Sequence, residues 1–216
     1  MGWYARHVLP RLTDCACGSP ALSALRARTL ARASGRVLEI GFGSGTNLRW
    51  FAGSQVTRLL ALEPSRELIA LARARIARQG LPAGLPAPEF IAATAEAIPL
   101  PDASLDSIVV AFTLCSVRDP VRAGAEMYRV LRPGGSVYYA EHGLAATPRA
   151  RRWQRLLEPA WTPLAGGCHL TRDPTQLFRQ LGFVTDAHTG AIGPPTLAWR
   201  TIDRLFPGYW GSATRP

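Results

Sequence analysis

Short β-rich runs alternate with longer helical runs along most of this chain, and this alternation constrains the fold more than any other feature. Strands that alternate with helices pair into a mostly parallel sheet with helices on both faces. We therefore predict an α/β fold, a Rossmann-like, doubly wound, mostly parallel seven-stranded sheet. The predicted strands cover residues 36–40, 58–63, 89–91, 106–111, 136–141, a run beginning at 182–184, and 209–213. The predicted helices cover residues 21–32, a run beginning at 47–51, 65–76, 120–131, 151–157, and a run opening at 171–174.

Length and apolar content are those of an ordinary globular protein. The chain has 216 residues, of which 47% are hydrophobic, and this length suits a single domain. No run approaches the ~20 apolar residues that a membrane-spanning helix needs. The first residues also lack the apolar stretch of a signal peptide. We expect a cytoplasmic protein.

The four cysteines are expected to be free thiols, as is usual in the cytoplasm. Cys15 and Cys17 are spaced C-x-C, and no second close pair exists in the sequence. Structural zinc sites usually combine two such pairs, so no metal site is predicted. Cys115 and Cys168 are interpreted as small buried thiols rather than as nucleophiles.

The net charge is +10, and every one of the 25 basic residues is arginine. Such a charge can attract nucleic acid, anionic substrates or an anionic membrane surface. The arginines are scattered, with small clusters such as that at residues 149–152. Solvated helix faces explain this pattern better than a binding patch does. Nucleic acid is not expected as a partner, whereas peripheral contact with an anionic membrane remains open.

A glycine-rich loop directly follows the first predicted strand. Its sequence, Gly41-Phe42-Gly43-Ser44-Gly45, lets the backbone turn sharply and approach a ligand closely. Glu63 ends the second strand, where a carboxylate can accept hydrogen bonds from both ribose hydroxyls of a nucleoside. Glu39 beside the loop would repel a pyrophosphate but suits a cation. A ligand with a ribose, positive charge and no phosphate fits best, which favours S-adenosylmethionine (SAM) over a dinucleotide.

Three segments resemble the motifs of class I SAM-dependent methyltransferases. They are residues 37–45 (Val-Leu-Glu-Ile-Gly-Phe-Gly-Ser-Gly), 94–102 (Thr-Ala-Glu-Ala-Ile-Pro-Leu-Pro-Asp) and 129–135 (Arg-Val-Leu-Arg-Pro-Gly-Gly). The family often has an acidic residue at position 94, where this chain has a threonine that can still accept a hydrogen bond. The cofactor site that the resemblance implies consists of Glu39, Gly41, Gly43, Gly45, Asn47, Glu63, Pro64, Thr94, Ala95, Glu96 and Thr113.

Later segments resemble a narrower group, the methyltransferase-like thiol S-methyltransferases of animals and their small bacterial relatives. These segments are Leu-Cys-Ser-Val at 114–117, Glu-His at 141–142 and Gly-Cys-His-Leu-Thr-Arg at 167–172. The resemblance covers about residues 36 to 185 and lacks the N-terminal membrane anchor of the animal proteins. It divides the single domain into an N-terminal helical segment (1–34), a SAM-binding core (35–142) and an acceptor-side segment (143–216), in which residues 143–170 are a candidate lid.

Three side chains are candidates for catalysis. His142 follows the fifth strand and can titrate near neutrality as a general base. His169 is a second candidate, although the related sequences have asparagine there. Glu96 is a third, which could orient the acceptor or the adenine. A thiol acceptor ionises with a pKa near ~8.5 and therefore needs little help from a base.

The predicted function is transfer of a methyl group from SAM to a small, fairly apolar acceptor, plausibly a thiol. Two alternatives remain open. One is methylation of a lipid head group or a quinone precursor, and the other is a non-catalytic SAM-binding module. The oligomeric state and the methylated atom are left open by the sequence.

Overall fold

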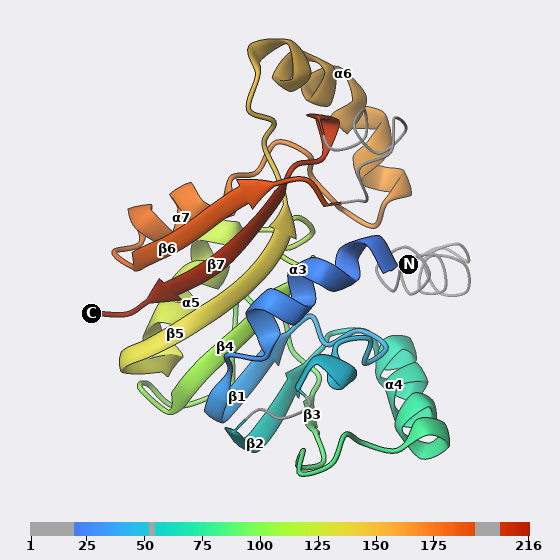
Figure 1. The fold of residues 1–216 in the computed structure, drawn as a ribbon, viewed down its shortest axis with the longest axis vertical. Helices are drawn as coiled ribbons and strands as arrows, with labels where there is room; N and C mark the ends of the chain where they lie inside the picture. The colour runs from blue at the N-terminus through green and yellow to red at the C-terminus, as the bar shows by residue number, and fades with distance from the viewer. Residues whose placement is uncertain (1–19, 52–54, 193–203) are drawn as a thin grey trace.

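A computed structural model describes residues 20–51, 55–192 and 204–216, and these residues contain one seven-stranded sheet (Figure 1). The strand order is β3-β2-β1-β4-β5-β7-β6, and every pairing is parallel except those of β7, which runs antiparallel to β5 and to β6. The strands are β1 (Ser34–Ile40), β2 (Gln55–Leu62), β3 (Glu89–Ile91), β4 (Leu105–Ala111), β5 (Leu131–His142), β6 (Val184–Gly190) and β7 (Gly208–Thr214).

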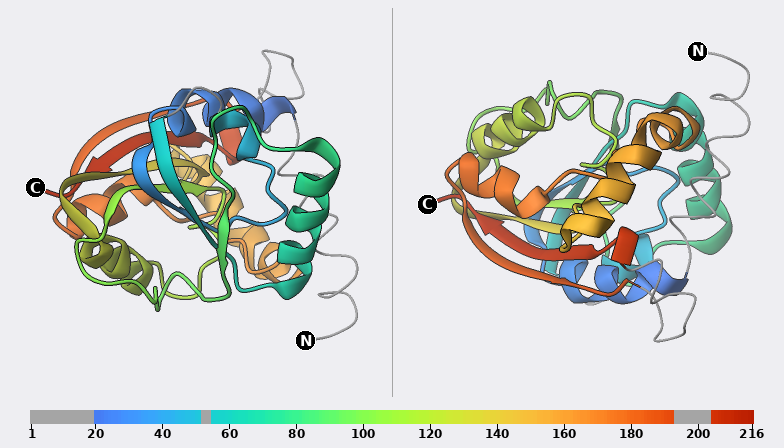
Figure 2. Two further views of the ribbon diagram at one scale, coloured as in Figure 1. Left: turned by 90° about the horizontal axis from the view of Figure 1, so that it is seen from below. Right: turned by 90° about the horizontal axis from the view of Figure 1, so that it is seen from above.

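Helices cover both faces of the sheet (Figures 1 and 2). One apolar cluster joins one face to α5 and α7, and a second joins the other face to α3, η1 and α4. The helices are α3 (Pro20–Leu30), the short 3-10 helix η1 (Leu48–Phe51), α4 (Arg66–Gln79), α5 (Pro120–Val130), α6 (Pro148–Leu164) and α7 (Pro174–Gln180).

The central strands bury side chains on both faces because helices lie on both sides. In β1, Val37 belongs to the cluster under α3 and Leu38 to the cluster under α5. In β4, Val109 belongs to the cluster under α3 and Ile108 to the cluster under α5. This alternation follows from the two-residue period of a strand. It confirms the predicted doubly wound, mostly parallel sheet of seven strands.

Strand order reverses direction between β1 and β4, which lie side by side although β2 and β3 separate them in the chain. In open α/β sheets, ligands bind beyond the carboxyl ends of the strands at such a switch point. The loops after β1, β2, β4 and β5 meet at this edge. The fold therefore places the predicted site residues in one region.

The helix predicted to begin at residues 47–51 is of the 3-10 type in the residues described there. Only a 3-10 helix forms, at Leu48–Phe51. The side chain of Asn47 donates to the buried Glu39, and the Leu48 N–H donates to Gly45 O, a three-residue spacing. The loop geometry thus keeps the chain tighter than an α-helix at this point.

The predicted start of the fifth strand was also wrong, because β5 begins at Leu131 rather than at residue 136. The Pro-Gly-Gly segment lies inside the strand instead of between helix and strand. The β4–β5 register shifts between Leu105 and Ser107, so the extra residues form an irregularity within the pairing. Glycines tolerate such a bulge.

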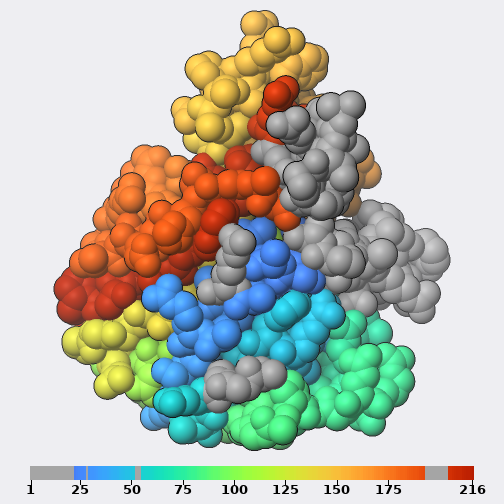
Figure 3. Space-filling model, in the orientation of Figure 1, coloured from blue at the N-terminus to red at the C-terminus, as the bar shows by residue number. Residues whose placement is uncertain are grey.

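α6 is longer than predicted and lies beyond the carboxyl edge of the parallel strands (Figure 1), where it stands out in the space-filling view (Figure 3). The Thr147 side chain accepts from the Ala150 N–H and begins the helix, with Pro148 in its first turn. Pro159 and Pro163 lie within the helix. The predicted lid segment is therefore largely helical.

In the described part of the chain, no helix is both long and apolar enough to cross a membrane.

Candidate active site

The glycine loop turns tightly at the end of β1. Gly41, Gly43 and Gly45 all have positive φ, a conformation that side chains disfavour. The N–H groups of Gly41 and Phe42 both donate to Leu62 O, which ties the loop to the end of β2. A Cβ on Gly41 would overlap the Thr113 side chain. The loop after β1 is therefore packed directly against the loop after β4.

Glu39 and Asn47 form a buried acceptor pair behind this loop. Asn47 Nδ2 donates to Glu39 Oε1 at 2.6 Å, and Glu39 is completely buried. Among the described residues, Glu39 Oε2 and Asn47 Oδ1 have no hydrogen-bond partner. Burial raises the pKa of Glu39 from 4.5 to about 8, against the bond from Asn47. Two buried acceptors without donors suit a cationic ligand with several N–H groups, such as the ammonium of SAM.

Glu63 is also buried, with 5% of its surface exposed. Its Oε2 accepts from Gly43 N at 2.9 Å, and its Oε1 accepts from Ser65 N at 2.9 Å. Burial raises the pKa of Glu63, while these two bonds oppose the rise. Each carboxylate oxygen keeps a lone pair for a further donor. The arrangement is compatible with a ribose diol, and the neighbouring Pro64 is exposed at the same edge.

The loop after β3 is built differently from what the sequence suggests for Glu96. The Glu96 carboxylate accepts from Arg118 N at 2.8 Å and receives a bond from the Thr94 side chain. Burial raises its pKa, but these hydrogen bonds outweigh burial and lower it overall. Glu96 thus joins this loop to the start of α5. Ala95 is buried beside it, and Thr94 is exposed.

Glu141 holds the loop after β4, a role that the sequence analysis missed. It lies within β5 and is 1% exposed. Its Oε1 accepts from Thr113 N at 2.6 Å and from Leu114 N at 2.9 Å. Burial raises its pKa, which the backbone N–H groups counteract. The Glu-His pair in the sequence was the only signal, because the two bonded N–H groups lie far away in the chain.

A cavity of about 270 Å³ opens beside this loop. It is lined by Leu114, Cys115, Glu141, His142 and Arg172, among others. Residues of α5 and α7 also line this cavity. Of the three predicted catalytic residues, only His142 lines this cavity. His142 Nε2 lies 3.0 Å from Cys168 Sγ.

His169 faces α6 rather than the cavity. The ring Nδ1 of His169 lies 2.8 Å from Glu158 Oε1. The backbone N–H of His169 donates to Cys115 O at 2.8 Å. Burial raises the pKa of Glu158, but the bond with His169 and further hydrogen bonds lower it overall. The fully buried Gln154, also on α6, accepts from Ala145 N and donates to Gly143 O. The sequence analysis assigned no role to either of these α6 side chains.

The predicted residues therefore form two adjoining halves. Glu39, Asn47, Glu63 and the glycine loop form one half, and His142 with its cavity forms the other. Thr113 joins them, because its hydroxyl lies 3.2 Å from Ile40 O and its backbone is held by Glu141.

Comparison with known proteins shows the family to which the chain belongs. A family described as "Methyltransferase domain" matches residues 38–139. Thiol S-methyltransferase TMT1A of Homo sapiens is 34% identical over 176 residues, covering 80% of this chain and 69% of that protein. TMT1B of Rattus norvegicus is 34% identical, covering 63% of this chain and 55% of its own length. The chain thus spans between about half and two thirds of these relatives.

Other similarities reach beyond thiol methylation. A phosphatidylethanolamine N-methyltransferase of Cereibacter sphaeroides is 34% identical, covering 54% of this chain and 57% of that protein. Among solved structures, phosphoethanolamine N-methyltransferase 2 of Haemonchus contortus in complex with SAM superimposes with a TM-score of 0.68 at 15% identity, covering 98% of this chain and 60% of that one. At this identity the superposition demonstrates the shared fold.

The raised pKa of Glu39 predicts a pH dependence of stability. Between pH 4.5 and about 8, the folded, ligand-free protein keeps a proton on Glu39 that the unfolded chain releases. The free energy of unfolding therefore falls as pH rises through this window. Glu39→Gln removes the titration, so its stability relative to the unsubstituted protein should increase by at least about 1.4 kcal/mol, one pKa unit, between about pH 5 and about pH 8.

Urea unfolding at the two pH values measures this difference. Glu89→Gln is the matched control, because Arg58 lowers the pKa of the exposed Glu89 and places its titration below the window. Its effect on stability should be the same at both pH values. An equally pH-independent effect of Glu39→Gln would show that Glu39 is ionised in the folded protein.

Proposed function

Because the chain belongs to the SAM-dependent methyltransferases, we propose that it transfers the methyl group of SAM to a small, fairly apolar thiol. One observation carries the choice of acceptor. Three segments that resemble the thiol S-methyltransferases, at 114–117, 141–142 and 167–172, are far apart in sequence but contribute residues to one cavity or its wall. Leu114 of the cavity wall follows Thr113, which packs against Gly41 of the glycine loop, where SAM is expected. The thiol relatives support the same choice.

The cofactor is assigned by chemistry. The ammonium of SAM meets the free acceptor atoms of Glu39 and Asn47, and Glu63 accepts from the ribose hydroxyls. The loop of Gly41, Gly43 and Gly45 lets the amino-acid part approach the backbone. The segment after β3 faces the adenine. The remaining proposed contacts are Pro64, Thr94, Ala95, Glu96 and Thr113.

The reaction is a direct displacement. The acceptor thiol releases its proton to water and reacts as the thiolate. A lone pair of its sulfur forms the new S–CH₃ bond, and the electron pair of the broken bond stays on the cofactor sulfur. The products are a neutral thioether and S-adenosylhomocysteine. Holding the two sulfurs in line with the methyl group can lower the barrier by roughly 7–11 kcal/mol. No enzyme nucleophile takes part.

The three candidate catalytic side chains have different positions. His142 lines the cavity and is the one that can contact an acceptor. His169 is bound to Glu158, and Glu96 holds the start of α5. We therefore assign His169 and Glu96 positioning roles. They fix the loops on which the cofactor and acceptor sites depend.

α6 supports a second proposal, peripheral contact with an anionic membrane surface. Trp153, Leu156 and Leu157 are 51%, 63% and 43% exposed on one side of the helix. The basic side chains of Arg152 and Arg155 are exposed next to them. Exposed apolar residues flanked by arginines are typical of helices that lie in a membrane interface. An apolar thiol would be concentrated at the same surface, and so would the lipid acceptor of the alternative function.

Three acceptors with the same apolar ring test the atom that is methylated. Benzyl mercaptan should be methylated at least about 100-fold faster than benzyl alcohol, which does not ionise without a strong base. It should also react faster than benzylamine, because a thiolate is the stronger nucleophile toward the methyl group. Product formation from labelled SAM measures each rate. Methylation of phosphatidylethanolamine vesicles or a quinone precursor instead of the thiol would favour the lipid or quinone alternative. SAM binding without any product would favour a non-catalytic module.

Sedimentation with anionic liposomes tests the membrane contact. The protein should sediment at low salt, and Leu156→Ser should weaken the partition by about tenfold, as expected for removing one buried leucine. Val184→Ser is the matched control, because Val184 is 67% exposed on β6, away from α6. Equal weakening by both substitutions, or no sedimentation of the unsubstituted protein, would rule out docking through α6.

A further inference from the structure

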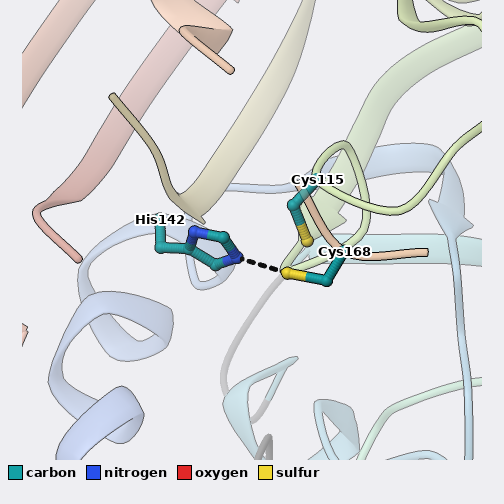
Figure 4. Close-up of side chains that lie close together, drawn as sticks. All are labelled: Cys115, His142 and Cys168. Atoms are coloured by element: carbon teal, nitrogen blue, oxygen red, sulfur yellow. Dashed lines mark hydrogen bonds between the residues drawn. The ribbon is translucent and has the colours of Figure 1, made fainter. Parts of the chain in front are cut away.

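Two cysteines and a histidine from three separate segments converge beside the cavity (Figure 4). Cys115 follows β4, His142 ends β5, and Cys168 follows α6. Cys115 Sγ, His142 Nε2 and Cys168 Sγ all lie within 4.8 Å of one another, and the imidazole nitrogen lies 3.0 Å from Cys168 Sγ. We call these three residues the Cys-His-Cys cluster.

The donor atoms of this cluster are those that zinc prefers. Two sulfurs and an imidazole nitrogen bind Zn²⁺ at about 2.3 Å and 2.0–2.1 Å. Around a tetrahedral ion with these bond lengths, neighbouring donors lie roughly 3.5–3.8 Å apart. In the cluster, His142 Nε2 and Cys168 Sγ are closer than this, at 3.0 Å, and all donor atoms lie within 4.8 Å of one another. Side-chain adjustments of an ångström or less would place all three donors around one ion.

The two cysteines of the cluster are buried, His142 is half-buried, and the backbone around them is fixed by other contacts. Cys115 is 4% exposed and Cys168 is 9% exposed. His169 N donates to Cys115 O, which holds the two cysteine segments together. Glu141 binds the N–H groups of Thr113 and Leu114 just before Cys115. The three donors are therefore pre-arranged by the fold itself.

Three protein ligands leave one position of a tetrahedral ion open, and here that position adjoins the cavity. Cys115 and His142 both line it. Structural zinc sites use four protein ligands, whereas catalytic sites keep the fourth position for water or substrate. The described part of the chain offers no further His, Cys, Asp or Glu donor to this group. The arrangement thus matches the open type of site.

We propose that Cys115, His142 and Cys168 bind a zinc ion, and that the acceptor thiol occupies its fourth position. The second half of this inference rests on the function proposed above. The thiol R–SH binds as R–S⁻ and releases its proton to water. Its sulfur then takes the methyl group from the sulfonium, while the electrons of the broken bond remain on S-adenosylhomocysteine. The neutral product R–S–CH₃ is a weaker ligand than a thiolate and leaves, and the zinc ion keeps its charge and oxidation state.

The proposed site departs from the sequence expectation of no metal. That expectation considered the C-x-C pair Cys15–Cys17, which lies outside the described residues. Cys115 and Cys168 have no metal-site spacing in the sequence, because α5, β5 and α6 separate them. Their proximity becomes visible only when the ends of β4 and β5 and the segment after α6 are brought together.

Zinc binding by the full chain directly tests the first part of the inference, that the Cys-His-Cys cluster binds a zinc ion. The protein is reduced with a phosphine, loaded with Zn²⁺, passed through a desalting column and analysed by atomic emission. We expect one zinc ion per chain. Cys168→Ser and His142→Ala should each weaken zinc binding by at least about 100-fold. The double variant Cys15→Ser/Cys17→Ser is the matched control and should retain the ion.

Loss of zinc from the Cys15→Ser/Cys17→Ser control, or unchanged zinc in Cys168→Ser, would overturn the site. The same conclusion follows if the reduced protein binds no zinc, or if mass spectrometry shows that Cys115 and Cys168 join in a disulfide that forms equally in the presence of Zn²⁺. Circular dichroism of each variant shows whether it is folded. If the single variants unfold, Cd²⁺ titration of the unsubstituted protein and of the control still decides, through the thiolate-to-cadmium absorption band.

Replacement of zinc by cobalt tests the second part of the inference, that the acceptor thiol binds the ion, and it needs no methyl transfer. In Co²⁺-loaded protein lacking SAM, benzyl mercaptan should shift the visible absorption of the ion, and benzyl alcohol should not. An unchanged spectrum would contradict thiol coordination. Zinc binding together with no thiol methylation would refute the proposed function alone. Full thiol methylation after chelation, with SAM binding intact, would refute the zinc inference alone.

Discussion

Three buried carboxylates at the ends of neighbouring strands determine how the loops of this protein meet. Glu39 in β1 binds Asn47, Glu63 after β2 binds Gly43 and Ser65, and Glu141 in β5 binds the loop after β4. Each carboxylate is costly to bury, and each is compensated by N–H groups of a loop. The loops are thereby fixed at one edge of the sheet. Among the described residues, Glu39 Oε2 has no hydrogen-bond partner, and the proposed cationic ligand would supply one there.

The part of the candidate site formed by His142 and the cavity depends on a different set of contacts, most of them made by α6. Gln154 and Glu158 bind the segments before and after this helix, and the latter segment carries Cys168 to His142. The helix therefore fixes the two segments that flank it. Elsewhere on its surface it exposes Trp153 and Leu156. One helix thus connects the segment that carries Cys168 to the surface that we propose contacts a membrane.

Local patterns were sufficient to predict the sheet. Short β-rich runs indicated the strands, an apolar stripe indicated α4, and Gly41, Gly43 and Gly45 marked a tight turn, which the structure has. The roles of Glu141, Gln154 and Glu158 were not predictable, since their partners are distant in sequence. The same holds for the approach of Cys115 to Cys168. The start of β5 at Leu131 was missed because glycines usually end an element, whereas here they form an irregularity within a strand.

Calorimetric titration with SAM and S-adenosylhomocysteine tests the central claim, that the edge defined by Glu39 and Glu63 is a SAM site. Both ligands should bind in the micromolar range, and Glu63→Ala should weaken binding by about 1.5–3 kcal/mol, as expected for lost hydrogen bonds to a buried partner. Glu89→Ala removes an exposed carboxylate on β3 and should leave affinity unchanged. Absence of binding by the unsubstituted protein, or equal affinity of the Glu63→Ala variant, would contradict the account.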